Sequence, residues 1–188
     1  MGKDTFYNLK DDKKEKILEV LKHVFAQKPF HKVTVKEIVD ELGIARGSFY
    51  QYFEDLEDAY FEIINRELVD IHGLFAKLIN ENKGNLETTL MDFGNSLEEV
   101  LFVENTYSIY KYIYLYWDET LSQRWKKAHS SQVRILSDNS NDMDSEKMHY
   151  IKGVIHMIIK RNFQENWDKK EFRKKYEKQI YWLIKGVN

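Results

Sequence analysis

The twelve residues Leu42–Phe53, LGIARGSFYQYF, combine two glycines, one arginine and four aromatic side chains. On a helix, Phe49 and Phe53 stand four residues apart and would point together into a core. The remaining positions form a different stripe, whose members are Arg46, Gly47 and Tyr50, with Ser48 and Tyr52 at its flank. This stripe carries residue types that suit contact with another molecule.

The chemistry of the stripe suits nucleic acid. An arginine can donate two hydrogen bonds to the edge of a guanine, and a glycine permits close approach of the backbone. A serine can reach a base or a phosphate, and tyrosine hydroxyls suit phosphate oxygens, which fix register without reading sequence. The spacing alone leaves a second interpretation open, in which these are ordinary surface residues of a three-helix bundle.

The elements around the stripe have a clear order. Apolar residues at helical intervals predict a first helix of about four turns, which ends before Pro29. Thr34 and Glu37 have the spacing of a capping box at the start of a short second helix, which Gly43 ends. A third helix begins at Ala45. Two short helices joined by a glycine-containing turn and braced by a first helix form a helix-turn-helix, whose second helix enters the major groove of DNA.

The rest of the chain is also predicted to be helical, since one proline and eight glycines in 188 residues favour long helices. Asp55 and Asp58 cap a long helix over about residues 55–80, which would connect two domains. Further helices are predicted at roughly 86–102, 106–117, 119–137, 145–164 and 168–186. The segment YSIYKYIYLYW has strand-like alternation, but we predict a helix because no other segment offers a strand to pair with it. The fold class is therefore all-α, with about nine helices.

The segment KPFHKVTVKEIVDELGIARGSFYQYFEDLEDAY resembles the DNA-binding domain of the tetracycline-repressor (TetR) family of bacterial transcription regulators, over about residues 12–62. The matching positions are Thr34, Ile38, Gly43, Ile44, Gly47, Phe49, Tyr50, Tyr52 and Phe53. The resemblance implies a helix-turn-helix DNA-binding domain at residues 1–54 and a helical domain for effector binding and dimerisation at 55–188. The expected DNA-binding residues are Thr34, Lys36, Ala45, Arg46, Gly47, Ser48, Tyr50 and Tyr52.

Two positions depart from the family pattern. Ala45 stands where members often carry a serine or threonine, so a hydroxyl cap on the recognition helix is missing. Leu56 stands where members often carry a lysine that contacts a phosphate. We therefore expect affinity for the DNA backbone to depend on Lys32, Lys36 and the tyrosines.

The resemblance also implies that the second domain dimerises through its last two helices and encloses an effector pocket. The candidate interface residues are Ile151, Ile155, Ile158, Ile159, Tyr176, Ile180, Leu183 and Ile184. These residues can alternatively pack within the monomer, but a monomer does not read two half-sites one helical turn apart. The candidate pocket residues are Phe93, Leu97, Phe102, Tyr107, Tyr110, Tyr114, Trp117 and Trp125. They suit a flat or hydrophobic small molecule, although any single one of them more often fills a core.

Composition limits the remaining possibilities. The 29 Lys and Arg residues face 31 Asp and Glu residues, so no net basic field attracts nucleic acid from a distance. We expect no membrane span and no signal peptide, because no apolar run approaches about 18 residues and the N-terminus is charged. The absence of cysteine fits the cytoplasm. His149 and His156 stand two turns apart, too far to share one metal, and we expect neither a metal nor a cofactor.

We therefore expect a sequence-specific DNA-binding transcription regulator. The leading hypothesis is a homodimeric repressor of a palindromic operator, released by a small aromatic or hydrophobic effector. A second hypothesis keeps DNA binding but lets the C-terminal domain respond to a protein partner or to no small molecule. A third, an all-helical enzyme, has little support because the chain lacks a phosphate loop, a nucleophile elbow and a metal-protease motif. The operator, the effector and the sign of regulation stay open.

Overall fold

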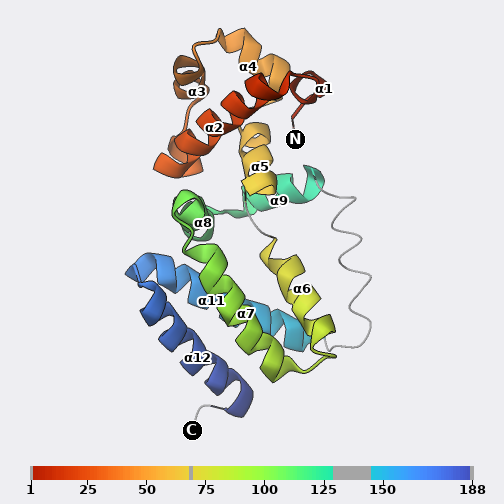
Figure 1. The fold of residues 1–188 in the computed structure, drawn as a ribbon, viewed down its shortest axis with the longest axis vertical. Coiled ribbons are helices and arrows are strands. Elements are labelled where there is room, and N and C mark those ends of the chain that lie inside the picture. The colour runs from red at the N-terminus through yellow and green to blue at the C-terminus, as the bar shows by residue number, and fades with distance from the viewer. Residues whose placement is uncertain (1, 68–69, 129–144, 187–188) are drawn as a thin grey trace. The chain divides into compact units, whose positions relative to one another are not determined.

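The computed structural model in Figure 1 describes residues 2–67, 70–128 and 145–186. Every regular element within these ranges is a helix, which confirms the all-α prediction. The chain forms two compact units. The first comprises Met1–Leu68 and Ser108–Ser130, and the second comprises Val69–Tyr107 and Ser131–Asn188.

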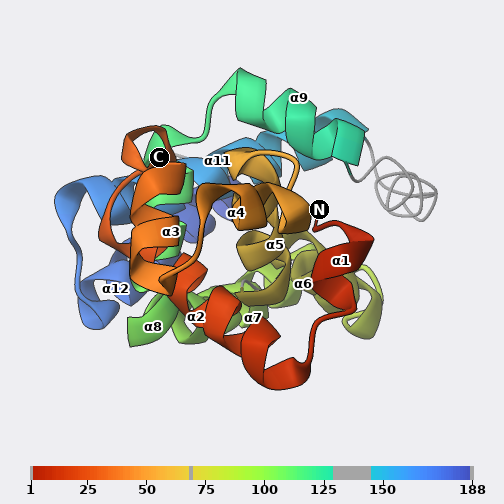
Figure 2. The ribbon, with the colours of Figure 1, turned by 90° about the horizontal axis from the view of Figure 1, so that it is seen from above.

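The first unit carries the N-terminal helices. They are α1 (Asp4–Tyr7), α2 (Asp11–Gln27), the short 3-10 helix η1 (Phe30–Lys32), α3 (Val35–Leu42), α4 (Arg46–Tyr52) and α5 (Leu56–Glu67). It also holds α9 (Glu119–Ala128) and most of α8 (Glu104–Tyr116). Helix α2 packs against α3 and α5, while α4 packs against both α3 and the short α1 (Figure 2).

Apolar faces of these helices form the core of the first unit. The buried residues of α2 are those that its spacing predicts: Ile17, Leu18, Leu21, Val24 and Phe25. Phe49 and Phe53 are 1% and 0% exposed and their ring centroids lie 5.4 Å apart. The prediction that both rings point into the core is confirmed, and each such ring contributes about 1.5–3 kcal/mol by its removal from water.

The second unit contains α6 (Ile71–Glu81), α7 (Leu86–Leu101), α11 (Ser145–Glu165) and α12 (Lys169–Lys185). Helix α7 packs against α6 and α12. Gly94 makes the approach of α12 possible, because a methyl group there would overlap the ring of Tyr176. The Tyr176 hydroxyl donates a buried hydrogen bond of 2.7 Å to the Leu90 carbonyl. Its polar end is thus satisfied inside an apolar core.

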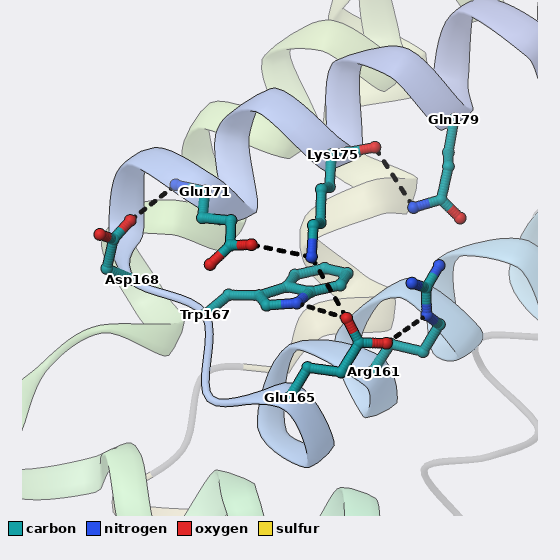
Figure 3. Close-up of polar contacts among 7 residues, drawn as sticks. All are labelled: Arg161, Glu165, Trp167, Asp168, Glu171, Lys175 and Gln179. Carbon is teal, nitrogen blue, oxygen red and sulfur yellow. Dashed lines mark hydrogen bonds and ion pairs between the residues drawn. The ribbon is translucent and has the colours of Figure 1, made fainter.

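A polar cluster fixes the turn between α11 and α12, as Figure 3 shows. The buried Trp167 donates a 2.8 Å hydrogen bond from Nε1 to Glu165, and Lys175 Nζ lies 4.1 Å from the Trp167 ring centroid. Hydrogen bonds from Arg161, Trp167 and Lys175 lower the pKa of Glu165 to about 2. Asp168 caps the first turn of α12. These contacts therefore fix the direction of α12 relative to α11.

The prediction of one continuous helix over about residues 55–80 is wrong. Helix α5 ends at Glu67 and α6 begins at Ile71. Asp70 has an extended backbone (φ −67°, ψ 94°), and its side chain accepts a 3.1 Å hydrogen bond from the His72 N–H, so it is an N-cap. The short α1 was also not expected, and the end of the helix predicted over 119–137 lies outside the described residues.

Candidate DNA-binding surface

A tight turn joins α3 to α4. Gly43 ends α3 in the left-handed conformation (φ 67°, ψ 35°), which glycine adopts at low steric cost. The Gly43 N–H donates to the Asp40 carbonyl at 3.3 Å, and the Ile44 N–H donates to the Val39 carbonyl at 3.1 Å. These bonds satisfy carbonyls at the end of α3. The sequence prediction for this turn is confirmed.

A capping box starts α3 as its sequence predicts. The Glu37 N–H donates to Thr34 Oγ1 at 3.4 Å, and the Thr34 N–H donates to Glu37 Oε2 at 2.9 Å. Lys28 forms an ion pair with the same carboxylate. The hydrogen bond from Lys28 and then that from the Thr34 backbone lower the pKa of Glu37. Thr34 is exposed, and its hydroxyl accepts the capping hydrogen bond, so the hydroxyl is held at a fixed place at the start of α3.

The outer face of α4 presents a pair of side chains one helical turn apart. Arg46 Nη2 donates to the Tyr50 hydroxyl at 3.2 Å, and the guanidinium carbon lies 5.8 Å from the Tyr50 ring centroid. Both side chains are exposed. Ser48, between them in sequence, is half-buried. This face therefore offers guanidinium N–H groups and a phenolic hydroxyl to solvent.

Gly47 lies on the same face, and its own chain does not require a glycine there. A methyl group at this position would meet nothing within 4 Å, and the backbone is outside the left-handed region. Glycine inside a helix costs roughly 0.5–1 kcal/mol relative to alanine. The glycine is thus unfavourable for the helix, and packing within the chain does not explain it. The absence of a side chain at Gly47 leaves open space at the surface of α4.

The prediction that Tyr52 lies on the exposed flank of this face is wrong. Its side chain is 7% exposed and belongs to the core of the first unit. Lys13 of α2 lies with Nζ 5.5 Å from the Tyr52 ring centroid. The structure therefore brings a lysine from the run DDKKEK to the end of α4, a cation that the spacing of α4 alone did not indicate.

The lysines near the helix-turn-helix differ in their partners. Lys28 is paired with Glu37, so its charge is matched within the chain. Lys32 and Lys36 are exposed, and neither forms an ion pair with another residue that the structure describes. Their charges are available to a phosphate backbone.

The two departures from the family pattern have structural counterparts. Ala45 occupies the N-cap of α4 with an extended backbone and makes no side-chain cap hydrogen bond. Leu56 is half-buried and packs against the core of the first unit. Helix α4 therefore lacks a hydroxyl cap, and the position where a phosphate-binding lysine is common serves packing instead.

The candidate pocket residues divide between the two units. Tyr110, Tyr114, Trp117 and Trp125 fall in the first unit, and Phe93, Leu97, Phe102 and Tyr107 fall in the second. Several of them pack on aromatic rings of their own unit: the ring centroids of Trp125 and Phe61 lie 5.1 Å apart, and those of Phe102 and Phe172 lie 5.6 Å apart. Three of them, Phe93, Leu97 and Tyr110, are at most 3% exposed. These three side chains therefore fill the core and do not line a pocket.

Two cavities among the described residues are lined by other side chains. A groove of about 490 Å³ in the second unit is lined by Glu87, Met91, Lys174, Glu177, Lys178, Ile180, Tyr181, Ile184 and Lys185. A smaller cavity of about 200 Å³ in the first unit is lined by Phe30, His31, Glu57, Tyr116, Asp118, Thr120 and Leu121. Neither contains a residue of the predicted pocket.

Most candidate interface residues are buried within the single chain. Those at most 4% exposed are Ile151, Ile155, Ile158, Ile159, Tyr176 and Ile180. Leu183 and Ile184 are half-buried. The six buried side chains pack in the monomer, as the alternative interpretation holds, and have no surface left for a partner. The exposed apolar side chains of α7, α11 and α12 are instead Met91, Tyr150, Met157, Tyr181 and Trp182.

A pair of histidines in the second unit is a further contact that the sequence did not indicate. His72 Nε2 of α6 lies 3.2 Å from His156 Nε2 of α11, and the ring centroids are 5.3 Å apart. Across the described ranges, no three His, Asp or Glu side chains gather so as to hold a metal ion. None of the described helices is both long and apolar enough to span a membrane.

Comparison with known proteins gives matches in both parts of the chain. Residues 17–61 match the family "Bacterial regulatory proteins, tetR family", and residues 86–186 match "Tetracyclin repressor, C-terminal domain". The chain is 41% identical over 59 residues to the uncharacterized HTH-type transcriptional regulator YfiR of Bacillus subtilis (strain 168), which is 31% of this chain and 29% of that protein. It is 29% identical over 70 residues to the HTH-type transcriptional repressor KstR2 of Rhodococcus jostii (strain RHA1), which is 37% and 34% of the two chains.

Solved structures share the fold over nearly the whole chain. A TetR family transcriptional regulator from Chloroflexus aurantiacus J-10-FL superposes with a TM-score of 0.57 at 21% identity, covering 99% of this chain and 98% of that one. The regulator FadR from Bacillus subtilis, in complex with stearoyl-CoA, gives 0.61 at 14% identity, with 93% and 99% covered. Together with the helix-turn-helix geometry, the match over residues 86–186 shows that this chain belongs to the tetR family of bacterial regulatory proteins, which are DNA-binding transcription regulators.

Proposed function

We propose that the protein is a homodimeric repressor that reads a palindromic operator through α4 and is released by a small hydrophobic or aromatic effector. The observation that carries the proposal is the exposed face of α4, where Arg46 and Tyr50 flank a glycine that internal packing does not require. A short helix that presents an arginine beside open space suits the floor of a major groove. A cytoplasmic location, where bacterial DNA lies, is part of this proposal.

Arg46 is the proposed base reader. Its guanidinium has five N–H donors, so the bond to Tyr50 leaves others free to form two bonds with the O6 and N7 atoms of a guanine. Tyr50 orients the guanidinium and offers its own hydroxyl to a phosphate. Gly47 allows the backbone of α4 to approach the base edges.

Phosphate contacts are proposed for Thr34, Lys32, Lys36 and the newly identified Lys13. Each lies on an exposed part of the first unit, near α3 or α4 in sequence or in space. Each lysine that neutralises a phosphate adds about −0.9 to the slope of log affinity against log salt. The proposal predicts binding that weakens with increasing salt concentration, because each phosphate contact releases counterions from the DNA.

Dimerisation is proposed through the exposed sides of α11 and α12. Tyr150, Met157, Tyr181 and Trp182 are apolar side chains left at the surface there, 64%, 41%, 61% and 37% exposed. The groove of about 490 Å³ adds a concave area beside Tyr181. A twofold interface would place the same surface of two chains face to face. Replacing Tyr181 and Trp182 together by glutamate should give a monomer in light scattering, whereas Ile158 variants should lose stability instead.

An effector site is proposed in the second unit around Asn162. This side chain is 0% exposed, and neither amide atom has a hydrogen-bond partner among the residues that the structure describes. Leaving such a group unpaired costs about 1–3 kcal/mol, which a ligand with a polar group and an apolar body would recover. The stearoyl-CoA bound to FadR from Bacillus subtilis, a neighbour in fold, is a molecule with both features.

A second candidate keeps DNA binding but has the second unit respond to a protein partner or to no small molecule. The burial of Phe93 and Leu97 in the core favours it, because these side chains do not line a cavity. Release from DNA by acyl-CoA or aromatic ligands, measured on the parent protein and on Asn162→Leu, separates the candidates, because in the second candidate these ligands release neither protein. If an effector uses Asn162, the variant is more stable without ligand and keeps DNA binding, but acyl-CoA or aromatic ligands no longer release it. Unchanged release by such a ligand excludes the Asn162 site.

The experiment that tests the proposed function is selection of bound duplexes from random DNA by the full-length protein. A palindrome whose half-sites lie about one helical turn apart supports a dimeric DNA reader. Enrichment of no sequence would reject the DNA-reading role of α4.

A further inference from the structure

The C-terminal end of α4 is held by a segment far away in sequence. A helix end leaves its last carbonyls without intrahelical partners. Residues 2–9, which we name the N-terminal brace, donate to three consecutive carbonyls there. Lys3 Nζ donates to the Tyr50 carbonyl at 3.0 Å, and the Lys3 N–H donates to the Tyr52 carbonyl at 2.8 Å. The hydroxyl of Thr5 donates to the carbonyl of Gln51.

The N-terminal brace is itself fixed to its surroundings. Phe6 is 0% exposed, and its ring centroid lies 4.9 Å from that of Phe53. The Tyr7 hydroxyl donates to Glu62 Oε2 of α5 at 2.6 Å. Lys14 of α2 lies with Nζ 5.8 Å from the Phe6 ring centroid and 5.4 Å from that of Tyr7. The brace therefore links the end of α4 to both α2 and α5.

Helix α4 depends on such support because it is short and lacks a side-chain cap at its start. It has seven residues, and Ala45 makes no side-chain hydrogen bond to its first turn. Isolated helices of this length are not stable in water. The position of α4 is therefore set by the contacts of Phe49 in the core and by the N-terminal brace at the C-terminal end of the helix.

We propose that the N-terminal brace is a positioning element for DNA recognition, with Lys3 and Thr5 as its positioning residues. By holding three carbonyls of α4, it fixes the direction in which Arg46 and Tyr50 point. This inference rests on the DNA-reading role proposed above for α4. It assigns a function to residues that lie outside the helix-turn-helix.

A direct contact of Lys3 with a DNA phosphate is the competing explanation. Lys3 Nζ lies 3.1 Å from Glu54 and also donates to the Tyr50 carbonyl, so its charge is already matched within the chain. The two roles differ in their salt dependence. Loss of a phosphate contact lowers the magnitude of the salt slope by about 0.9, whereas loss of a positioning contact lowers affinity at an unchanged slope.

Paired variants of the full-length protein isolate single hydrogen bonds. Thr5→Val removes the hydroxyl at constant shape, and Thr5→Ser keeps it. Lys3→Pro and Lys3→Ala both remove the ammonium, but only proline also removes the N–H, and the observed φ of −74° at Lys3 suits proline. Thr120→Val, at an exposed position of α9, is the matched control.

Two measurements are made on each variant: hydrogen exchange of the α4 amides in the free protein, and affinity for the selected operator duplex across a salt series. We expect Thr5→Val and Lys3→Pro to speed exchange in α4 and to weaken operator binding about 2- to 10-fold at unchanged salt slope. Thr5→Ser and Thr120→Val should match the parent protein, and Lys3→Ala should lie between parent and proline variant.

Three results would overturn the proposal. Unchanged exchange in α4 shows that the brace does not hold the helix. Faster exchange with full operator affinity shows that it does not serve recognition, and a reduced salt slope for Lys3→Ala assigns Lys3 to a phosphate. If the parent protein selects no duplex at all, the DNA-reading role fails, while the exchange data still decide whether the brace holds α4.

Discussion

The guanidinium of Arg46 and the hydroxyl of Tyr50 are joined by a 3.2 Å hydrogen bond on the exposed face of α4. This bond favours one direction of the exposed arginine side chain. Holding a long side chain before binding reduces the conformational entropy lost on binding. In the DNA-reading role proposed for α4, the pair is therefore organised before the duplex binds.

Tyr50→Phe tests this organisation. The ring stays and the hydroxyl is lost, so we expect operator binding to weaken by about 0.5–1.5 kcal/mol. Stability should not change, because the side chain is exposed. Titration of the operator against Tyr50→Phe, Arg46→Ala and the double variant gives the coupling between the two residues. Fully additive losses would show that Tyr50 does not orient Arg46.

Gly47→Ala separates stability from recognition. Alanine favours the helix and meets nothing within 4 Å, so the free energy of unfolding should rise by roughly 0.5–1 kcal/mol. Operator affinity should nevertheless fall, because the methyl group occupies space that the DNA needs. Urea unfolding and operator titration on the same preparation of Gly47→Ala separate the two effects. Unchanged operator affinity in the stabilised variant would remove Gly47 from the interface.

The histidine pair predicts loss of stability in mild acid. Burial, the neighbouring His72 and Lys152 lower the pKa of His156 to about 4. Because the folded pKa lies below the ordinary value of 6.5, the unfolded chain takes up a proton first as pH falls, and unfolding becomes easier. We expect stability to be constant above about pH 6.5 and to decrease from there towards pH 4.

His156→Gln should flatten this decrease in urea unfolding measured at a series of pH values. His149→Gln is the matched control, since His149 is an exposed residue of the same helix. The same pH dependence in the parent protein and in His156→Gln would assign the acid sensitivity to other groups.

Local rules explain what could be predicted from the sequence. The Thr34–Glu37 capping box, the left-handed Gly43 and the buried pair Phe49 and Phe53 depend on residues within a few positions of each other, and all are observed. The exposed face of α4 followed from the same local geometry. Neighbours in sequence decide these features, so no knowledge of the tertiary fold was needed.

Contacts between distant segments explain what could not be predicted. The spacing within α4 predicts Tyr52 on the exposed flank, but packing across the first unit buries it beside Lys13. Periodicity indicates the apolar face of α11 but not which helix covers it, so in the sequence alone Ile158 fits a dimer interface as well as the monomer core in which it is buried. The hydrogen bond of Thr5 to Gln51 joins residues 46 positions apart.

The break before α6 is a different case. It depends on a local signal, because aspartate is a common N-cap and Asp70 immediately precedes α6.

The central claim is that α4 reads DNA, and the most direct measurement is duplex selection by the parent protein and by Arg46→Ala side by side, followed by affinity for the selected site. The account predicts a palindromic site for the parent, with a loss of about 1–3 kcal/mol and a relaxed preference at one base pair in each half-site for Arg46→Ala. The same affinity and the same base preferences for both proteins would contradict it.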